Sequence, residues 1–392
     1  MNTRTRRLTP ILAAVLLAAL PSASLAQGDD VQVHVFVSQG YAKSTSSNDV
    51  MKGTGDGTFN FNEFGFNVQK QVTARLRIGM QLFAQARGDV GKDTPTIDWA
   101  LGDYRLRDWT GIRFGKVKMP LGLYNESRDN DSLRTFIFLP QGTYDDGARE
   151  STIAQTGMAG YGTIPMKQAG RLGYQLHMGA LAMVADGGVA KSIQMALPVK
   201  VTDAHGGTTY VANAEWQTPI EGLRLAVTRF QTAFTVEVTT TALAPGIGLP
   251  PGIALPVDFT KLTRSYVSCE YAFRNLVLAA EFRRQEVRAT VGGVIPRNQD
   301  DESYYVSSTY RLNDIAEVGA YYEDYYLNRF DKSDVARFRK DLAAAVRVDI
   351  NKYWLVKAEL HKIHGTALMI PTGTNALAEH SYVLALKTTF SF

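Results

Sequence analysis

The sequence has a single cysteine among its 392 residues, so it can form no internal disulfide. This excludes the small secreted folds that cystine bridges hold together. Cys269 shares a strand face with Val267 and Tyr271, because side chains two residues apart point to the same side of a strand. We therefore interpret Cys269 as a small apolar side chain facing an apolar surface, not as a reactive thiol.

Long hydrophobic runs are also missing from most of the chain. The uncharged stretch at residues 238–257 contains four prolines and several glycines. A proline inside a helix removes a hydrogen bond and clashes with the preceding turn, so this stretch cannot be a membrane-spanning helix. If the chain lives in a membrane, it crosses the bilayer with the strands of a closed barrel.

The N-terminal residues carry a different pattern. Three arginines precede an apolar run at residues 11–20, and small residues follow at 24–26. The run is about ten residues long, which is too short to span a bilayer as a helix. The order of basic, apolar and small residues is typical of a secretory signal peptide. We expect residues 1–26 to be that signal peptide and residues 27–392 to form one domain.

An excess of one charge sign is likewise missing. Without the three arginines of residues 1–26, 39 of the 42 basic residues remain, against 38 acidic residues. A nearly neutral chain has no surplus of cations with which to neutralise phosphates, so no nucleic-acid partner is expected.

Catalytic and metal-binding motifs are absent too. No Gly-x-Ser-x-Gly sequence occurs, and the chain has only six histidines. His361 and His364 lie three residues apart, so on one strand they point to opposite faces and cannot chelate one metal together. The sequence therefore predicts no catalytic residue, no metal site and no cofactor, and we do not expect an enzyme.

What the sequence does contain is alternation with a period of two. At residues 73–87, Leu76, Ile78 and Met80 face one way while Arg75 and Arg77 face the other. Similar segments recur along the chain, and most exceed the usual length of strands in soluble sheets. The sixteen predicted strands are 31–39, 59–70, 73–87, 96–106, 109–118, 152–163, 169–184, 208–217, 222–236, 261–273, 275–290, 301–312, 314–327, 338–350, 352–365 and 379–392.

The connections between these strands alternate in length. Long ones at 40–58, 88–95, 119–151, 185–207, 237–260, 291–300, 328–337 and 366–378 alternate with turns of a few residues. All twelve prolines beyond residue 26 fall in connections, as expected for residues that cannot donate to a strand ladder. Aromatic residues gather near strand ends, where membrane interfaces favour them. We predict an all-β transmembrane antiparallel barrel of about sixteen strands, with long extracellular loops and short periplasmic turns.

The last thirteen residues fit this prediction. Tyr382, Leu384, Leu386, Phe390 and Phe392 share one face of a strand, and small or polar residues occupy the other. A soluble protein would leave this apolar strand as an aggregation-prone edge, whereas barrel closure removes the edge. The terminal Phe392 also resembles the C-terminal signal that the bacterial barrel-assembly machinery recognises in outer-membrane barrels.

One stretch resembles a known family. Residues 96–129 contain Gly115-Lys116-Val117-Lys118-Met119-Pro120-Leu121-Gly122, which is similar to the Gly-basic-x-Lys-x-Pro-x-Gly run of porins of the phosphate-selective O/P type. The strong match covers about thirty residues. The resemblance implies a diffusion channel of the Gram-negative outer membrane, often a homotrimer in outer-membrane lipid, with a loop constriction and a basic eyelet that favours anions.

The connection at residues 119–151 is the candidate constriction loop. It carries the apolar run Phe136-Ile137-Phe138-Leu139, which is most simply buried against the barrel wall, so we expect this loop to fold into the lumen. By position, the resemblance implies that Lys116, Lys118, Arg128 and Arg134 line the eyelet. The same region contains Arg113, Asp129 and Asp131, and such mixed charge departs from a dedicated phosphate trap. The expected pore-lining wall residues include Arg75, Arg77, Arg347, Lys357, Lys387, Glu63, Glu281, Glu317, Glu323 and Glu359.

The sequence favours a porin that passes small hydrophilic solutes or ions by passive diffusion. Two other functions stay open: a substrate-specific channel for phosphate-like anions, and a surface-binding or adhesin barrel that would use the loops at 185–207 and 237–260.

Overall fold

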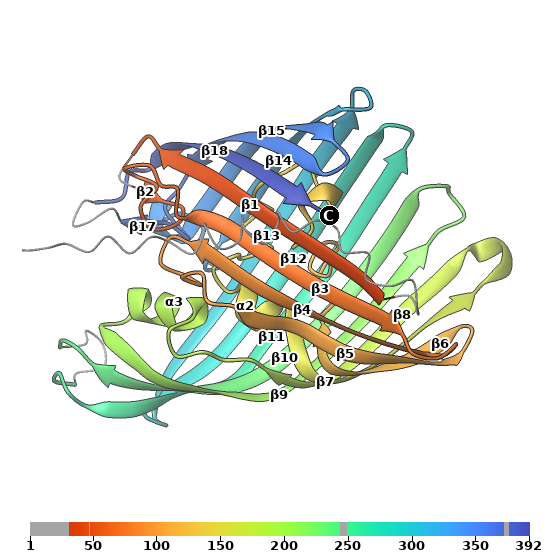
Figure 1. Ribbon diagram of the computed structural model, residues 1–392. Coiled ribbons are helices and arrows are strands. Elements are labelled where there is room, and N and C mark those ends of the chain that lie inside the picture. Colours follow the sequence, from red (N-terminus) through yellow and green to blue (C-terminus); the bar gives the residue numbers. More distant parts are fainter. Residues whose placement is uncertain (1–30, 47, 244–248, 372–375) are drawn as a thin grey trace, which may run out of the picture.

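The computed structural model describes residues 31–46, 48–243, 249–371 and 376–392, and the predicted signal peptide at residues 1–26 lies outside them. Sixteen antiparallel strands in this part of the chain close into one barrel (Figure 1). They are β1 (Val31–Ser44), β3 (Phe61–Gln71), β4 (Leu76–Arg87), β5 (Thr96–Arg107), β6 (Thr110–Lys118), β7 (Ala154–Pro165), β8 (Arg171–Leu181), β9 (Val199–Gln217), β10 (Leu223–Thr240), β11 (Ala254–Phe273), β12 (Leu276–Val291), β13 (Ile295–Arg311), β14 (Ala316–Tyr326), β15 (Phe338–Asn351), β16 (Trp354–His364) and β18 (His380–Ser391).

Small elements occupy the connections. They are the paired two-residue strands β2 (Asn48–Asp49) and β17 (Ile370–Pro371), the helices α2 (Arg149–Thr152) and α3 (Gly188–Ala196), and the 3₁₀ turns η1 (Asp131–Leu133), η2 (Lys167–Ala169) and η3 (Val335–Arg337). Among the described residues, no helix combines the length and the apolar character that a bilayer crossing requires.

The barrel closes where the first and last strands meet. β1 pairs with β18 in a register that places Val37 opposite Phe390. Beyond that ladder, the backbone amide of Phe392 donates to the carbonyl of Val35 at 2.8 Å. No strand of the barrel is left with a free edge, which is the condition that a membrane-spanning sheet must meet.

The two faces of the wall have opposite character. On β16, Leu355, Lys357 and Glu359 are buried toward the interior, whereas Leu360 is 59% exposed on the outside. Other large apolar side chains that are exposed on the outer face include Ile78, Phe114, Leu176, Val267, Val306 and Leu384. An apolar band on the exterior around a charged interior is the pattern of a barrel that faces lipid.

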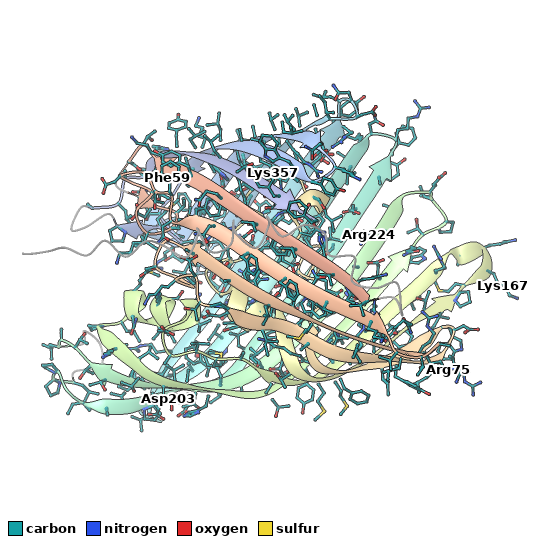
Figure 2. All side chains as sticks on the ribbon, viewed as in Figure 1. Phe59, Arg75, Lys167, Asp203, Arg224 and Lys357 are labelled. Carbon is teal, nitrogen blue, oxygen red and sulfur yellow. The ribbon has the colours of Figure 1, made fainter. Side chains whose placement is uncertain are left out.

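The two rims of the barrel also differ. In Figure 2, Arg75 and Lys167 lie at the right, on the side of the short turns, and Phe59 and Asp203 lie at the left, on the side of the long connections. Trp109, Trp216, Tyr310 and Tyr353 cluster at strand ends on the short-turn side and are partly exposed, as residues of an aromatic girdle should be.

All sixteen predicted strands are present, but several predicted boundaries were wrong. β9, β11 and β13 start six to nine residues earlier than predicted, so the expected long loop at residues 291–300 is only a turn at 292–294. The prediction that every proline lies outside the strands was also wrong, because Pro165, Pro256 and Pro296 belong to β7, β11 and β13. Each of these prolines lies within three residues of a strand end, where a missing N–H removes little of the ladder.

Candidate functional site inside the barrel

Residues 119–153, which connect β6 to β7, lie inside the barrel; we call them the inward segment. Arg149 pairs with Asp98 of β5 at 2.6 Å, and the hydroxyl of Tyr144 donates to Glu281 of β12. β5 and β12 lie seven strands apart around the barrel of sixteen, on opposite walls. A segment that contacts opposite walls of a closed barrel must run through its interior (Figure 1).

Apolar side chains fix the middle of the inward segment. Phe136, Ile137, Phe138 and Leu139 are each 6% exposed or less. Phe138 stacks on Phe61 of β3 with ring centroids 5.3 Å apart, and the edge of Phe136 meets another wall aromatic at 5.1 Å. Burial of each of these side chains contributes about 1.5–3 kcal/mol. The predicted inward fold of this apolar run agrees with these contacts.

Wall carboxylates hold the backbone of the inward segment. Glu359 accepts a hydrogen bond from the amide of Phe138 at 3.2 Å, and Glu323 accepts one from the amide of Thr143 at 3.1 Å. Glu281 likewise accepts from the amide of residue 123 at 3.0 Å. These wall acids were predicted as pore-lining groups; the structure shows that they anchor the loop. Each amide that they accept from is thereby satisfied away from water.

The predicted site residues form two groups. In the first, Nζ of Lys118 lies 2.8 Å from Asp129, and Nε of Arg113 lies 3.2 Å from Asp103. Lys116 is nearby on β6, and its Nζ donates to the carbonyl of residue 97 at 2.6 Å. These residues face cavities on one side of the interior.

The second group surrounds Asp131. Its carboxylate lies 2.8 Å from Nζ of Lys387, 3.4 Å from Nζ of Lys357 and 3.1 Å from the guanidinium of Arg134. Arg128, also a predicted site residue, instead pairs with Asp146 at 2.5 Å. Every predicted basic site residue except Lys116 therefore has a carboxylate partner among the described residues; Arg128 is buried and the others are half-buried.

These partners shift the pKa values of the charged groups in the inward segment. Burial by itself raises the pKa of Asp131, but the ammonium groups of Lys357 and Lys387 outweigh it and hold the pKa well below its ordinary value. The pKa of Asp129 is lowered in the same way, chiefly by Lys118 against the opposing effect of burial. Burial lowers the pKa of Arg149, yet the Asp98 carboxylate outweighs burial and raises it. The carboxylates of Asp129 and Asp131 and the guanidinium of Arg149 are therefore ionised at neutral pH.

A polar belt between the adjacent strands β4 and β5 and the inward segment lies between two cavities. Nε2 of Gln81 donates to Asp98 at 3.0 Å and to Asp129 at 2.7 Å, and Asp98 in turn accepts from Arg149. A cavity of about 380 Å³ lies on the short-turn side, lined by Gln69, Arg77, Arg113, Lys118 and Asp129. A cavity of about 200 Å³ lies on the long-connection side, lined by Lys92, Asp98, Lys116, Arg149 and Glu150.

Sequence reasoning missed the bidentate pair of Arg149 with Asp98. Its two hydrogen bonds measure 2.6 and 2.9 Å, and both side chains are buried. A strict period of two would place Asp98 on the opposite face from Asp103, and a β-bulge at the register shift between Gln81 and Leu82 turns Asp98 inward. The position of Arg149 could not be predicted either, because a loop has no periodicity from which the direction of a side chain follows.

A second group that sequence reasoning missed has the donor atoms of a metal site. His364 at the end of β16 is paired in register with His380 at the start of β18. Glu379 lies beside them, and one ligand atom from each residue falls within 4.8 Å of the others. The comparison of His361 with His364 along one strand could not reveal this group, because the ladder between two strands creates it.

The closed sixteen-stranded barrel is similar in fold to several solved outer-membrane proteins, porins among them. OmpT of Vibrio cholerae superposes with a TM-score of 0.58 at 11% identity, over 94% of this chain and 100% of that one. An anion-selective porin of Comamonas acidovorans gives 0.56 at 12% identity, over 93% and 100%. The outer-membrane channel DcaP of Acinetobacter baumannii gives 0.56 at 10% identity, over 95% and 99%.

At these identities the likeness establishes the fold alone. No family profile matches the sequence, and no curated protein is similar to it. The resemblance to porins of the phosphate-selective O/P type stays a prediction.

Proposed function

We propose that the protein is a porin of the outer membrane, through which small hydrophilic solutes and ions diffuse passively. The observation that carries this proposal is the inward segment, which runs between opposite walls of a sixteen-stranded barrel. A barrel of this size encloses an aqueous channel, and a segment across its middle narrows that channel. The apolar outer face supports a location in lipid.

The eyelet lies at the polar belt of Gln81, Asp98, Asp129 and Arg149. The cavities of about 380 and 200 Å³ on its two sides are the approaches from the short-turn and long-connection ends. Charged groups of both signs line this path, and its basic members include Lys116, Lys118 and Arg149. Such a path orients polar solutes by its local field and selects them by its radius.

The pairing of charges argues for weak ion selectivity. Lys118, Arg113, Arg128 and Arg134 each lie within 3.2 Å of a carboxylate oxygen. A paired cation contributes little net field to the channel, and strong steering of anions needs a field of one sign. A dedicated phosphate channel is therefore less well supported than a general porin.

The assembly that we propose is a homotrimer. OmpT of Vibrio cholerae, which shares the fold, has been solved in a trimer form. Light scattering of the detergent-extracted protein checks the stoichiometry, and a monomer would overturn this part of the proposal. The signal peptide at residues 1–26 and recognition of Phe392 by the barrel-assembly machinery belong to the same proposal.

The test is a reversal potential in a planar bilayer. Across a tenfold KCl gradient an ideally selective channel gives about 59 mV, and we expect less than about half of that value. A potential near the ideal anion limit would instead support the substrate-specific anion channel. A barrel that inserts and carries no current would contradict the porin proposal and favour a surface-binding barrel.

A further inference from the structure

Strands β9 to β13 continue beyond the apolar band of the outer face. On β10 the outward side chains change from Leu225 and Val227, which is 54% exposed, to Arg229 and Gln231. Neighbouring strands change at the same level, as from Phe282 to Arg284 on β12. The far ends of these strands therefore stand outside the hydrocarbon layer, at the lower left of Figure 1.

The inner face of this extension is apolar instead of polar. Phe230, Phe234, Val236 and Val257 are each 7% exposed or less, and the helix α3 packs over the same surface through residues that include Ile193. The mouth of a water-filled channel would be expected to have a polar inner face. The apolar inner face of this extension therefore indicates a different role.

Part of the apolar wall is left uncovered and lines a cavity of about 390 Å³. Its apolar lining comes from α3 and from the inner faces of β10 to β12, including Ile193, Leu197, Phe230, Phe259, Leu262 and Val287. Its polar lining includes Arg264, Gln285 and Gln299, and Arg264 and Gln285 lie opposite each other on β11 and β12. This volume lies in the range of small-molecule sites, which combine apolar walls with a few polar groups.

Arg264 differs from the other inward arginines of the neighbouring strands. Its Nε donates to Oε1 of Gln285 at 2.5 Å, and its guanidinium lies 5.9 Å from the ring centre of Phe230. Arg224 and Arg283, by contrast, each have a carboxylate partner within 3 Å. Within the part of the chain that the structure describes, no carboxylate lies within 4.0 Å of the Arg264 guanidinium nitrogens. The guanidinium of Arg264 therefore has N–H donors that can bind a ligand.

We propose that this cavity binds amphipathic monocarboxylates, with the carboxylate on Arg264 and the apolar body against the inner wall beneath α3. A body of roughly eight carbons suits a cavity of this volume. The inference rests on the proposed porin function, because it makes the cavity a capture site at the mouth of the channel. Asp145 and Arg297 also line the cavity, so its lining carries two cations against one carboxylate.

The test uses octanoate as probe and acetate as its short counterpart, added on the long-connection side of a planar bilayer in KCl. Octanoate is expected to reduce the current at a concentration at least about tenfold lower than acetate. Arg264→Gln should raise the octanoate concentration for half-block by about tenfold or more, because a hydrogen-bonded charge is lost. Arg229→Gln, which removes an outward guanidinium on β10, is the matched control and should leave the block unchanged.

Equal block by octanoate and acetate, or unchanged block in Arg264→Gln, would overturn the proposal. Resistance of the folded barrel to unfolding by dodecyl sulfate shows that each variant is intact. If the wild-type protein carries no current, the porin proposal is wrong. Octanoate binding is then measured by calorimetry of the protein in nanodiscs. Octanoate binding to the wild type that Arg264→Gln abolishes would support the ligand site even without conduction. If the wild type binds no octanoate, the ligand site is contradicted.

A second, independent group of residues lies on the long-connection side, where β16 ends and β18 begins. Oε1 of Glu379 lies 2.9 Å from Nε2 of His364 and 3.9 Å from Nε2 of His380. Two ligands of one zinc ion, each about 2.0–2.1 Å from the metal in a tetrahedral site, lie about 3.3 Å apart. We infer that these three residues bind a zinc ion, which would join the two ends of the connection at residues 365–379.

Zinc chloride titration of the folded protein tests this site by calorimetry and by thermal unfolding. Zinc should raise the unfolding temperature, and a chelator should reverse the effect. His364→Gln and His380→Gln should each weaken zinc binding at least about tenfold, whereas His205→Gln, at an exposed histidine of β9, should not. Zinc affinity that is the same in His364→Gln and the wild type would contradict the inference.

Discussion

The carboxylate of Asp131 lies 2.8 Å from Nζ of Lys387, which joins the middle of the inward segment to the last strand of the barrel. Lys357 of β16 and Arg134 approach the same carboxylate at 3.4 and 3.1 Å, and all four side chains are largely buried. One loop acid thus contacts three cations, of which Lys387 also pairs with Glu63 of β3, so the position of the segment and the charge of the wall depend on each other.

Replacement of that acid should release the segment. In Asp131→Asn three cations lose their shared counter-charge, and breaking a buried charge network of this kind costs about 3–5 kcal/mol. We expect a lower unfolding temperature and larger fluctuations of single-channel current. Asp203→Asn, at a carboxylate that is 61% exposed, is the control and should change neither quantity. An unaltered unfolding temperature in Asp131→Asn would show that the cluster does not hold the segment.

Acid should weaken the same contacts. The pKa values of Asp129, Asp131 and Asp146 all lie below the ordinary value of 3.8 in the folded protein. A carboxyl whose pKa is depressed by folding stabilises the fold above pH 3.8, and this contribution is lost as the pH falls from there toward the folded pKa.

The unfolding temperature should therefore fall between pH 4 and pH 2, and a series of melts in this range measures the fall. In Asp131→Asn the fall should be smaller, since one of the three groups is gone. A variant that loses as much stability as the wild type over this range would exclude Asp131 as a contributor.

Gly122 at the start of the inward segment should not tolerate a side chain. Its φ is +66°, and an added Cβ would lie 2.6 Å from both the Glu281 carboxylate and the Tyr144 hydroxyl. Gly252 has a similar φ of +87° but open space around it, so Gly252→Ala carries only the backbone cost of about 1 kcal/mol. Gly122→Ala should lose more stability than this control and should alter the conductance. Equal losses in denaturant titrations would show that the contact with Glu281 has no effect.

The terminal Phe392 should matter more for assembly than for the finished barrel. Its ring is 59% exposed and stacks only on Tyr353, with ring centres 5.6 Å apart. Deletion of Phe392 should reduce the amount of barrel inserted in cells while refolding into detergent micelles stays close to the wild type. Comparable yields in cells would remove the assigned role of this residue in recognition by the assembly machinery.

The strands could be predicted because each has one apolar face toward the outside and one polar face toward the interior. That rule fails where β9, β11 and β13 continue beyond the apolar band, since Val257 then points inward and polar residues such as Lys261 point outward. The alternation continues there with its polarity reversed, and prolines such as Pro256 reinforce the impression of a loop. The largest errors in the boundaries predicted from polarity are therefore at these ends, although β1 also continues to Ser44, beyond its predicted end at residue 39.

The site could be predicted in part. The apolar run at Phe136–Leu139 indicated a buried loop, and its predicted inward direction agrees with the contacts described above. The partners of Arg128, Arg134 and Asp131 could not be predicted, because long-range ion pairs inside a barrel depend on the path of a loop that has no period. The group of His364 and His380 could not be predicted for a different reason: it is created by the register between β16 and β18, which the pattern of a single strand does not give.

The most direct test of the account compares the single-channel conductance of the wild type with that of a variant in which residues 126–147 are replaced by a short Gly-Ser linker. If the inward segment narrows an aqueous pore, the variant should conduct several times more current in the same KCl solution, while its barrel still resists dodecyl sulfate. A folded variant with the conductance of the wild type would contradict the central claim.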